Sequence, residues 1–242
     1  MMEALISIIP GISWACTFFL LLLSFIQFRI YWKKSYLRSK NLALFCFFAS
    51  IFAFEYFVAQ SRIFPPWFTH SYVAVSSVCL CLSLYYYMRS LNYFITVPQW
   101  VYQLYTSSAL VLAALVVVGI LSNLFFGTHL FFNPAEPLVT GNYFVDSYAT
   151  LIGSPSPYLK NILSASGVMT ILGALYMLRS LMKSSQDVYF ILGLLFSIFA
   201  ALKENVLLPL TMDYFVPVVF LSNLSEAFRM NSLSYREYMK EK

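Results

Sequence analysis

Residues 99–126 read QWVYQLYTSSALVLAALVVVGILSNLFF and contain no Asp, Glu, Lys or Arg. The hydrocarbon core of a bilayer requires about 20 consecutive apolar residues in a helix, because a spanning segment must satisfy its own backbone hydrogen bonds. This stretch is long enough and apolar enough to meet that requirement. It predicts a fold built from transmembrane helices.

The composition of the whole chain agrees with this prediction. Of 242 residues, 60% are hydrophobic and 10% are charged, whereas soluble domains contain about 25% charged residues. The mean hydropathy is +0.75. Apolar stretches recur from end to end, and no polar block is long enough for a separate soluble domain. We therefore expect one membrane domain, which binds the lipid bilayer and no nucleic acid.

Counting every comparable stretch predicts an all-α bundle of seven transmembrane helices. The first is too long for a signal-peptide core and begins beside Glu3 rather than a basic patch, so we expect it to remain as a spanning helix. The predicted spans are residues 4–30, 41–60, 66–88, 99–126, 157–178, 187–208 and 213–230.

The basic residues predict the orientation of this bundle. Twelve of the 15 Lys and Arg residues fall on one side of the predicted membrane. Connections rich in Lys and Arg stay in the cytoplasm, so the N-terminus is predicted outside and the C-terminus inside. The twelve are Arg29, Lys33, Lys34, Arg38, Lys40, Arg89, Arg179, Lys183, Arg229, Arg236, Lys240 and Lys242.

One connection, residues 127–157 between the fourth and fifth spans, is much longer than the others. Loops of this length in compact domains are usually functional or partly structured. Aromatic and β-branched residues flank the turn sequence NPAEP, which predicts an extracellular hairpin or cap over the bundle. An amphipathic loop lying on the membrane surface is an equal alternative.

Ionisable residues inside the spans are the candidates for function. Each costs at least about 2.5–3.5 kcal/mol at the centre of a bilayer, so such residues usually face the bundle interior and pair. Glu226 has a structural explanation, because Arg229 follows one turn later. The others lie toward the outer side. The predicted ligand-binding site comprises Glu55, His70, Lys160, Lys203, Glu204 and Asp213.

Lys203 and Glu204 are adjacent in ALKENV, residues 201–206, and therefore point about 100° apart on a helix. Lys203 needs an acidic partner from elsewhere, and either Glu55 or Asp213 lies at a suitable depth. Two alternatives remain open. Both side chains lie within two turns of the interface and extend toward it to reach water, or they form a proton or ion relay.

The end of the chain carries a stripe with heptad spacing. Leu221 begins it, and the five residues predicted to pass a signal onward follow at intervals of three and four. They are Leu224, Phe228, Asn231, Tyr235 and Tyr238. We expect a membrane domain over residues 1–230 and the start of a cytoplasmic coiled-coil helix over 231–242, which joins two copies as a homodimer. The alternative is that this helix packs on its own bundle.

Several classes of protein are disfavoured. The four cysteines lie in apolar runs, and neither they nor the two histidines have the spacing of metal ligands. No nucleophile elbow, zinc-protease, P-loop or dinucleotide motif is present. We expect no metal, no cofactor and no enzymatic activity.

Three passages carry a resemblance to a known family. They are YFVDSYATLIGSPSPYLKNIL at residues 143–163, ENVLLPLTMDYFVP at 204–217 and LSNLSEAFRMNSLSYREYMKEK at 221–242. With the predicted topology, they resemble the seven-transmembrane sensor domains of bacterial histidine kinases, diguanylate cyclases and adenylyl cyclases.

This resemblance implies a receptor in the bacterial inner membrane that passes a displacement of its last two helices to a cytoplasmic kinase or cyclase domain. No such domain lies in the sequence, so the chain would be a sensor fragment or a sensor whose effector was removed. The aromatic content of 19% suits a small apolar or amphiphilic ligand, although aromatic residues also fill helix bundles.

Two other functions stay open. One is a small transporter or channel that uses Glu55, Lys203 and Glu204 as a substrate or proton site. Transporters commonly carry internal repeats with broken helices in matching positions, and the sequence shows no convincing repeat. The other is a purely structural membrane subunit.

Overall fold

The protein is described from a computed structural model of the whole chain, and every regular element in its described part is helical. Four long helices follow one another: α1 (Met2–Lys34), α2 (Leu37–Ser61), α3 (Pro66–Leu91) and α4 (Gln99–Phe126). The structure describes residues 2–61, 63–94, 96–128, 130, 156–159, 161–162, 164–165, 168–169, 172, 224, 227–228, 230–232, 234–236 and 238–240.

All four helices are long and apolar enough to cross a membrane, so the chain is a membrane protein. Their apolar spans are Gly11–Lys34, Leu37–Glu55, Trp67–Leu91 and Gln99–Phe126. The predicted span at 187–208 and most of the loop at 127–157 lie outside the described residues, and the spans at 157–178 and 213–230 are described only in part. The seven-helix count therefore stays a prediction.

Local sequence signals explain where the helices end. Pro98 precedes α4, and Gly127 closes it with a φ of 62°, a left-handed conformation that glycine adopts without steric cost. At the start of α3, Pro65 is the residue before the helix and Pro66 is its first residue, a position that proline favours. In contrast, α1 and α2 extend beyond the predicted 4–30 and 41–60, because the helix continues through the basic residues until a short turn at Ser35.

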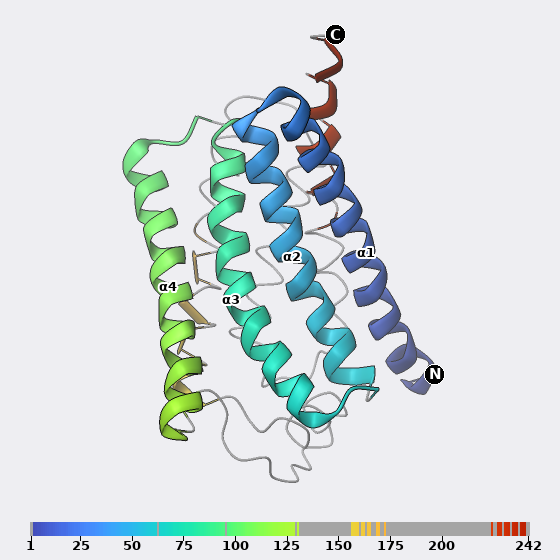
Figure 1. Cartoon of the computed structure of the whole chain (residues 1–242), viewed down its shortest axis with the longest axis vertical. Coiled ribbons are helices and arrows are strands. Elements are labelled where there is room, and N and C mark those ends of the chain that lie inside the picture. The colour runs from blue at the N-terminus through green and yellow to red at the C-terminus, as the bar shows by residue number, and fades with distance from the viewer. Residues whose placement is uncertain are drawn as a thin grey trace.

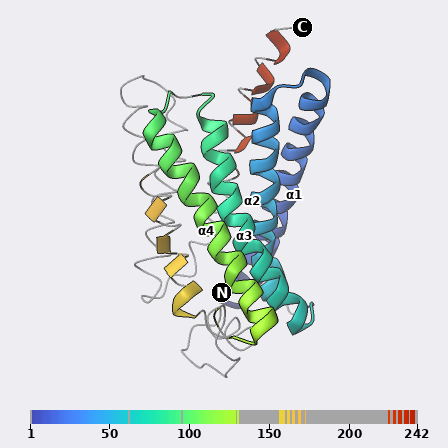
Figure 2. The same cartoon turned by 60° about the vertical axis from the view of Figure 1, so that its left-hand side comes forward.

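The four helices form an up-and-down series in which each packs against the next in sequence (Figure 1). α1 lies on one flank and α4 on the other, and the turned view shows the same order (Figure 2). The described residues between 224 and 240, which we call the C-terminal segment, are helical. They lie beside the C-terminal end of α1, at the end of the bundle opposite the N-terminus of the chain (Figure 1).

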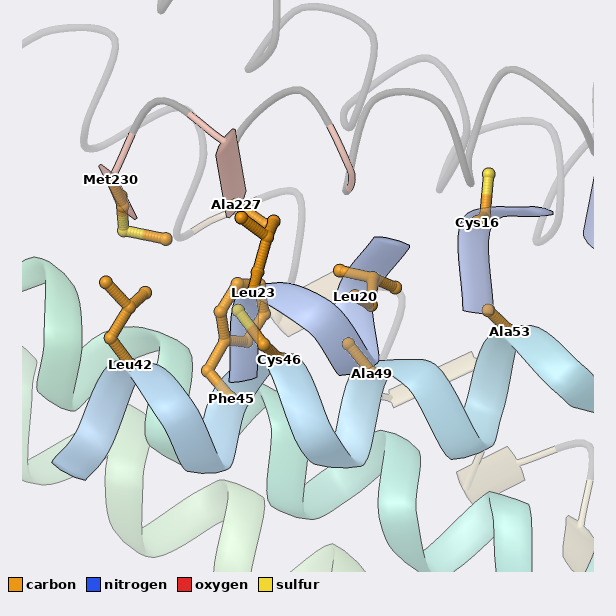
Figure 3. Packing of buried hydrophobic residues seen from close by; sticks show 10 residues of the cluster. All are labelled: Cys16, Leu20, Leu23, Leu42, Phe45, Cys46, Ala49, Ala53, Ala227 and Met230. Carbon is orange, nitrogen blue, oxygen red and sulfur yellow. The ribbon is translucent and has the colours of Figure 1, made fainter. Parts of the chain in front are cut away.

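Small side chains line the contact between α1 and α2. Within the described chain, the largest buried apolar cluster joins these two helices to the C-terminal segment (Figure 3). Small residues allow membrane helices to approach closely, which replaces the hydrophobic driving force that lipid does not supply. The cluster consists of Cys16, Leu20, Leu23, Leu42, Phe45, Cys46, Ala49, Ala53, Ala227 and Met230.

Charge is distributed unevenly along the bundle. Every Lys and Arg side chain in the described part lies at the end where α1 and α3 finish and α2 begins, which we call the cationic end. The residues are Arg29, Lys33, Lys34, Arg38, Lys40, Arg89, Arg236 and Lys240.

All four tryptophans are exposed, as residues of membrane interfaces are. Trp32 and Trp100 lie at the cationic end, where α1 finishes and α4 begins, and Trp67 lies at the other end, in the first turn of α3. Trp14 is separated from Trp32 by about 27 Å along α1, close to the thickness of a bilayer core of about 30 Å.

Candidate functional site

Glu55 provides a buried carboxyl group near the end of α2 that lies away from the cationic end. Its side chain is only 9% exposed, and it faces α3, where the hydroxyl of Ser76 donates a hydrogen bond to Glu55 Oε2. Glu55 closes the apolar span of α2, about 9 Å along the helix from Ser61. A carboxyl group that is buried and bonded in this way is a candidate for binding or switching.

The hydroxyl of Ser76 has two acceptors and a single hydrogen. It lies 2.9 Å from the carbonyl oxygen of Val73 as well as beside the Glu55 carboxyl. A serine oxygen can also accept a hydrogen bond. The pair can therefore change its bonding if a proton or a cation reaches Glu55, because Ser76 can return its hydrogen to Val73.

Aromatic side chains surround the same end of α2 and α3. The outer aromatic cluster, as we call it, has successive ring centroids 5.0 to 6.3 Å apart, a range in which aromatic rings attract. Tyr72 is fixed further by its hydroxyl, which donates to the carbonyl of Ile51 at 2.9 Å. The cluster consists of Phe54, Phe57, Phe64, Phe68 and Tyr72.

A second buried polar group lies where the C-terminal segment meets α1 and α2, and we call it the output junction. Ser234 donates to Gln27 Oε1 at 3.2 Å. Asn231 Nδ2 donates to its own helix at Ala227 O, 2.7 Å away, and lies 3.7 Å from Cys46 Sγ. Gln27 and Ser234 are fully buried, so this contact is closed to water.

Hydrogen bonding at the output junction is incomplete. Gln27 Nε2 is a buried donor and Asn231 Oδ1 a buried acceptor, and neither has a hydrogen-bond partner among the described residues. Such a group typically costs about 1–3 kcal/mol. Asn231 and Ser234 lie one helical turn apart, so the unpaired acceptor is one turn from the residue that binds Gln27.

The structure describes only two of the six residues predicted to bind a ligand. Glu55 lies in the α2–α3 contact, and His70 is half-buried in the first two turns of α3, directly after the buried Thr69. The remaining four lie outside the described residues, and so does the predicted pairing of Lys203 with Glu55. They are Lys160, Lys203, Glu204 and Asp213.

The predicted signalling stripe divides between two faces of the C-terminal segment. Asn231 and Tyr238 are buried, and Leu224 packs against the α1–α2 cluster. Phe228 and Tyr235 are exposed, although the Phe228 ring lies 6.1 Å from that of Phe19 on α1. The amide nitrogen of Asn231 thus donates within its own helix, and the buried face of the segment packs on its own bundle.

Sequence reasoning missed Ser76, Gln27 and Ser234, because its search for a site started from the ionisable residues inside the spans. A signal for Gln27 was present. Buried polar residues Ser13, Thr17, Ser24 and Gln27 recur on α1 at intervals of four, seven and three, which places them on one helix face.

Metal ligands do not gather in the described chain, where no three His, Cys, Asp or Glu side chains come together. All four cysteines are buried as free thiols. Comparisons with protein-family models, with curated proteins and with solved structures found no match.

Proposed function

We propose that this chain is a membrane sensor in which an event at the Glu55–Ser76 contact displaces the C-terminal segment. The observation that carries this proposal is the unpaired donor and acceptor at the output junction, Gln27 Nε2 and Asn231 Oδ1. A small shift of the segment along α1 would bring complementary groups together. We propose that the segment has a second arrangement in which these atoms are paired, as a signalling helix with two states requires.

Helix α2 provides the connection between the two sites. It contributes Glu55 to the contact with α3 and Cys46 to the output junction, about 13 Å apart along one helix. A ligand or proton that alters the Glu55–Ser76 bond would bias the position of α2. The outer aromatic cluster beside Glu55 suits an apolar or amphiphilic ligand, dissolved in the membrane or arriving from outside.

The cationic end supports the orientation that we propose. Connections rich in Lys and Arg usually stay in the cytoplasm, and every described Lys and Arg lies at this end, so we propose that it is cytoplasmic and that the start of α1 is outside. The C-terminal segment then leaves the membrane on the cytoplasmic side, where a kinase or cyclase effector would be joined. We propose that two copies associate through the exposed face of the segment, which carries Phe228, Tyr235 and Met239.

The test measures whether a change at Glu55 moves the distant segment. Leu37→Cys and Lys240→Cys introduce exposed thiols at the cationic end, while the native cysteines are buried and shielded from spin labels. Glu55→Gln replaces the ionisable carboxyl group by an amide of the same shape. In liposomes, pulsed EPR should show the label distance shift by about 1–5 Å, or a second distance appear.

The matched control is Ser71→Ala, which removes an exposed hydroxyl of α3 that donates to its own helix at Trp67 O. This variant should leave the distances unchanged. Identical distances in Glu55→Gln and the parent protein would overturn the sensing proposal. A sample labelled only at Lys240→Cys reports the distance between two copies, and the absence of dipolar coupling between their labels would contradict the dimer.

A transporter or channel is the second candidate, and the bonding of Ser76 favours it specifically. A carboxyl group beside a hydroxyl with an alternative acceptor can exchange a proton or hold a cation and then release it. Proton or sodium flux in proteoliposomes distinguishes the two candidates. Flux that disappears in Glu55→Gln would support transport, whereas a sensor should move nothing.

A further inference from the structure

The cationic end contains two kinds of basic residue. Arg38 lies over the Phe94 ring at 5.9 Å, Lys40 over Tyr31 at 5.8 Å, and Arg89 over Tyr85 at 5.5 Å, so these three are engaged within the subunit. Arg29 and Lys33 of α1 are instead exposed. They are separated by one helical turn, which places their Cβ atoms about 6 Å apart on one face.

The same face of α1 continues into the membrane as an exposed apolar stripe. Phe18, Leu22 and Phe25 precede Arg29 at intervals of four, three and four, and they are 53%, 44% and 60% exposed. Trp32 is 75% exposed beside the two cations, and its ring packs on that of Phe28 at 6.4 Å. Two cations, an interfacial tryptophan and an apolar track thus follow one another along the face.

We propose that this face of α1 is a binding site for an anionic phospholipid. The phosphate-bearing headgroup would contact Arg29 and Lys33, and an acyl chain would lie along Phe18, Leu22 and Phe25. The positive charge of Arg29 and Lys33 determines which kind of molecule this face of α1 would bind. In a two-fold dimer the same surface meets itself, so a second copy at this face would bring like charges together, whereas an anionic headgroup neutralises them.

This inference is independent of the sensing role, although the site lies beside the C-terminal segment through the contact of Phe19 with Phe228. A lipid held there would extend the apolar surface on which the segment rests. It would make packing of the segment dependent on lipid composition.

The test compares two lipids with identical acyl chains, phosphatidylglycerol and phosphatidylcholine, bound to the purified full chain and counted by native mass spectrometry. Two exposed cations on α1 are predicted to favour the anionic lipid by on the order of ten-fold. The double variant Arg29→Gln/Lys33→Gln should reduce this preference to less than about two-fold. If that variant does not fold, Lys33→Gln alone should reduce the preference by about half on a logarithmic scale.

The matched control is Arg236→Gln/Lys240→Gln, which removes two exposed cations from the same end of the bundle. It should keep the preference of the parent protein. An equal loss in both double variants would overturn the proposal in favour of a diffuse charge effect. The proposal would also be overturned if the parent protein bound the two lipids equally, or if soluble glycerol 3-phosphate displaced the lipid completely. It would be overturned as well if Arg29→Gln/Lys33→Gln changed the oligomeric state and not the lipid binding.

Discussion

Helix α1 makes two contacts of similar composition that differ in how their polar groups are satisfied. Toward α2, its hydroxyl groups donate to backbone carbonyls: Ser13 to Ala53, Ser24 to Ala43 at 2.8 Å, and Thr17 to Ser50 at 3.4 Å. Toward the C-terminal segment, Gln27 accepts one hydrogen bond and leaves its amide donor unpaired.

The difference follows from the chemistry of the side chains. A hydroxyl group can direct its hydrogen to the preceding turn of its own helix, as Thr17 also does to Ser13 O at 2.9 Å. A glutamine carries separate donor and acceptor atoms, and both need correctly placed partners when buried. The hydroxyl groups of α1 that face α2 thus all have acceptors. At the output junction, Gln27 Nε2 and Asn231 Oδ1 have no hydrogen-bond partner among the described residues.

The largest effect is expected from disturbing the satisfied contact. Ala53→Leu places a larger side chain at a position that is 1% exposed between α1 and α2. Overpacking should separate the helices and lower the free energy of unfolding by about 1–3 kcal/mol. Thermal unfolding in detergent measures the loss, with Ala114→Leu on the exposed side of α4 as the control. An unchanged midpoint for Ala53→Leu would show that the contact is loose.

An effect of opposite sign is expected at the output junction. Gln27→Met combined with Ser234→Ala removes the unpaired donor together with both partners of the Ser234–Gln27 bond, so the free energy of unfolding should rise by about 1 kcal/mol. Tryptic cleavage at the exposed Arg236 and Lys240 should become slower as the segment packs more firmly.

The control for this substitution is Gln103→Met, because Gln103 is exposed on α4 and should be neutral. Destabilisation by the Gln27→Met/Ser234→Ala variant would mean that the amide nitrogen of Gln27 has a partner in solution. The distinction between the two contacts of α1 would then fail.

The smallest effect is expected from removing one hydroxyl group from the satisfied contact. Ser24→Ala should lower the free energy of unfolding by about 0.6 kcal/mol, the average for hydrogen bonds between membrane helices. Ser107→Ala on the exposed side of α4 is the control. A loss of several kcal/mol at Ser24 would show that the hydroxyl bonds, rather than close packing, hold α1 to α2.

Hydropathy located the described helices because the membrane imposes length and polarity directly. The predicted 99–126 coincides with α4, where Pro98 and Gly127 mark both ends. The prediction ended α1 too early, at residue 30, since hydropathy falls at the first basic residues while helical hydrogen bonding continues to Lys34. The length of the membrane-spanning part of a helix can thus be predicted from hydropathy, whereas the length of its extension beyond the membrane cannot.

The partners of the buried polar groups could not be predicted in the same way. The census of charged residues identified Glu55, but its partner Ser76 is a neutral residue of a common type. The spacing of Asn231 placed it on a helix face without specifying whether that face meets its own subunit or another. Helical periodicity defines a surface, and only the tertiary arrangement defines what covers it.

The exposed tryptophans have a spectroscopic consequence. Since Trp14, Trp32, Trp67 and Trp100 are all exposed, intrinsic fluorescence should come from residues near the two lipid interfaces rather than from the bundle interior. Lipids brominated close to the headgroup should quench it strongly, and lipids brominated near the chain terminus should quench it weakly. The unlabelled protein would then report how deeply it lies in a bilayer of any chosen thickness.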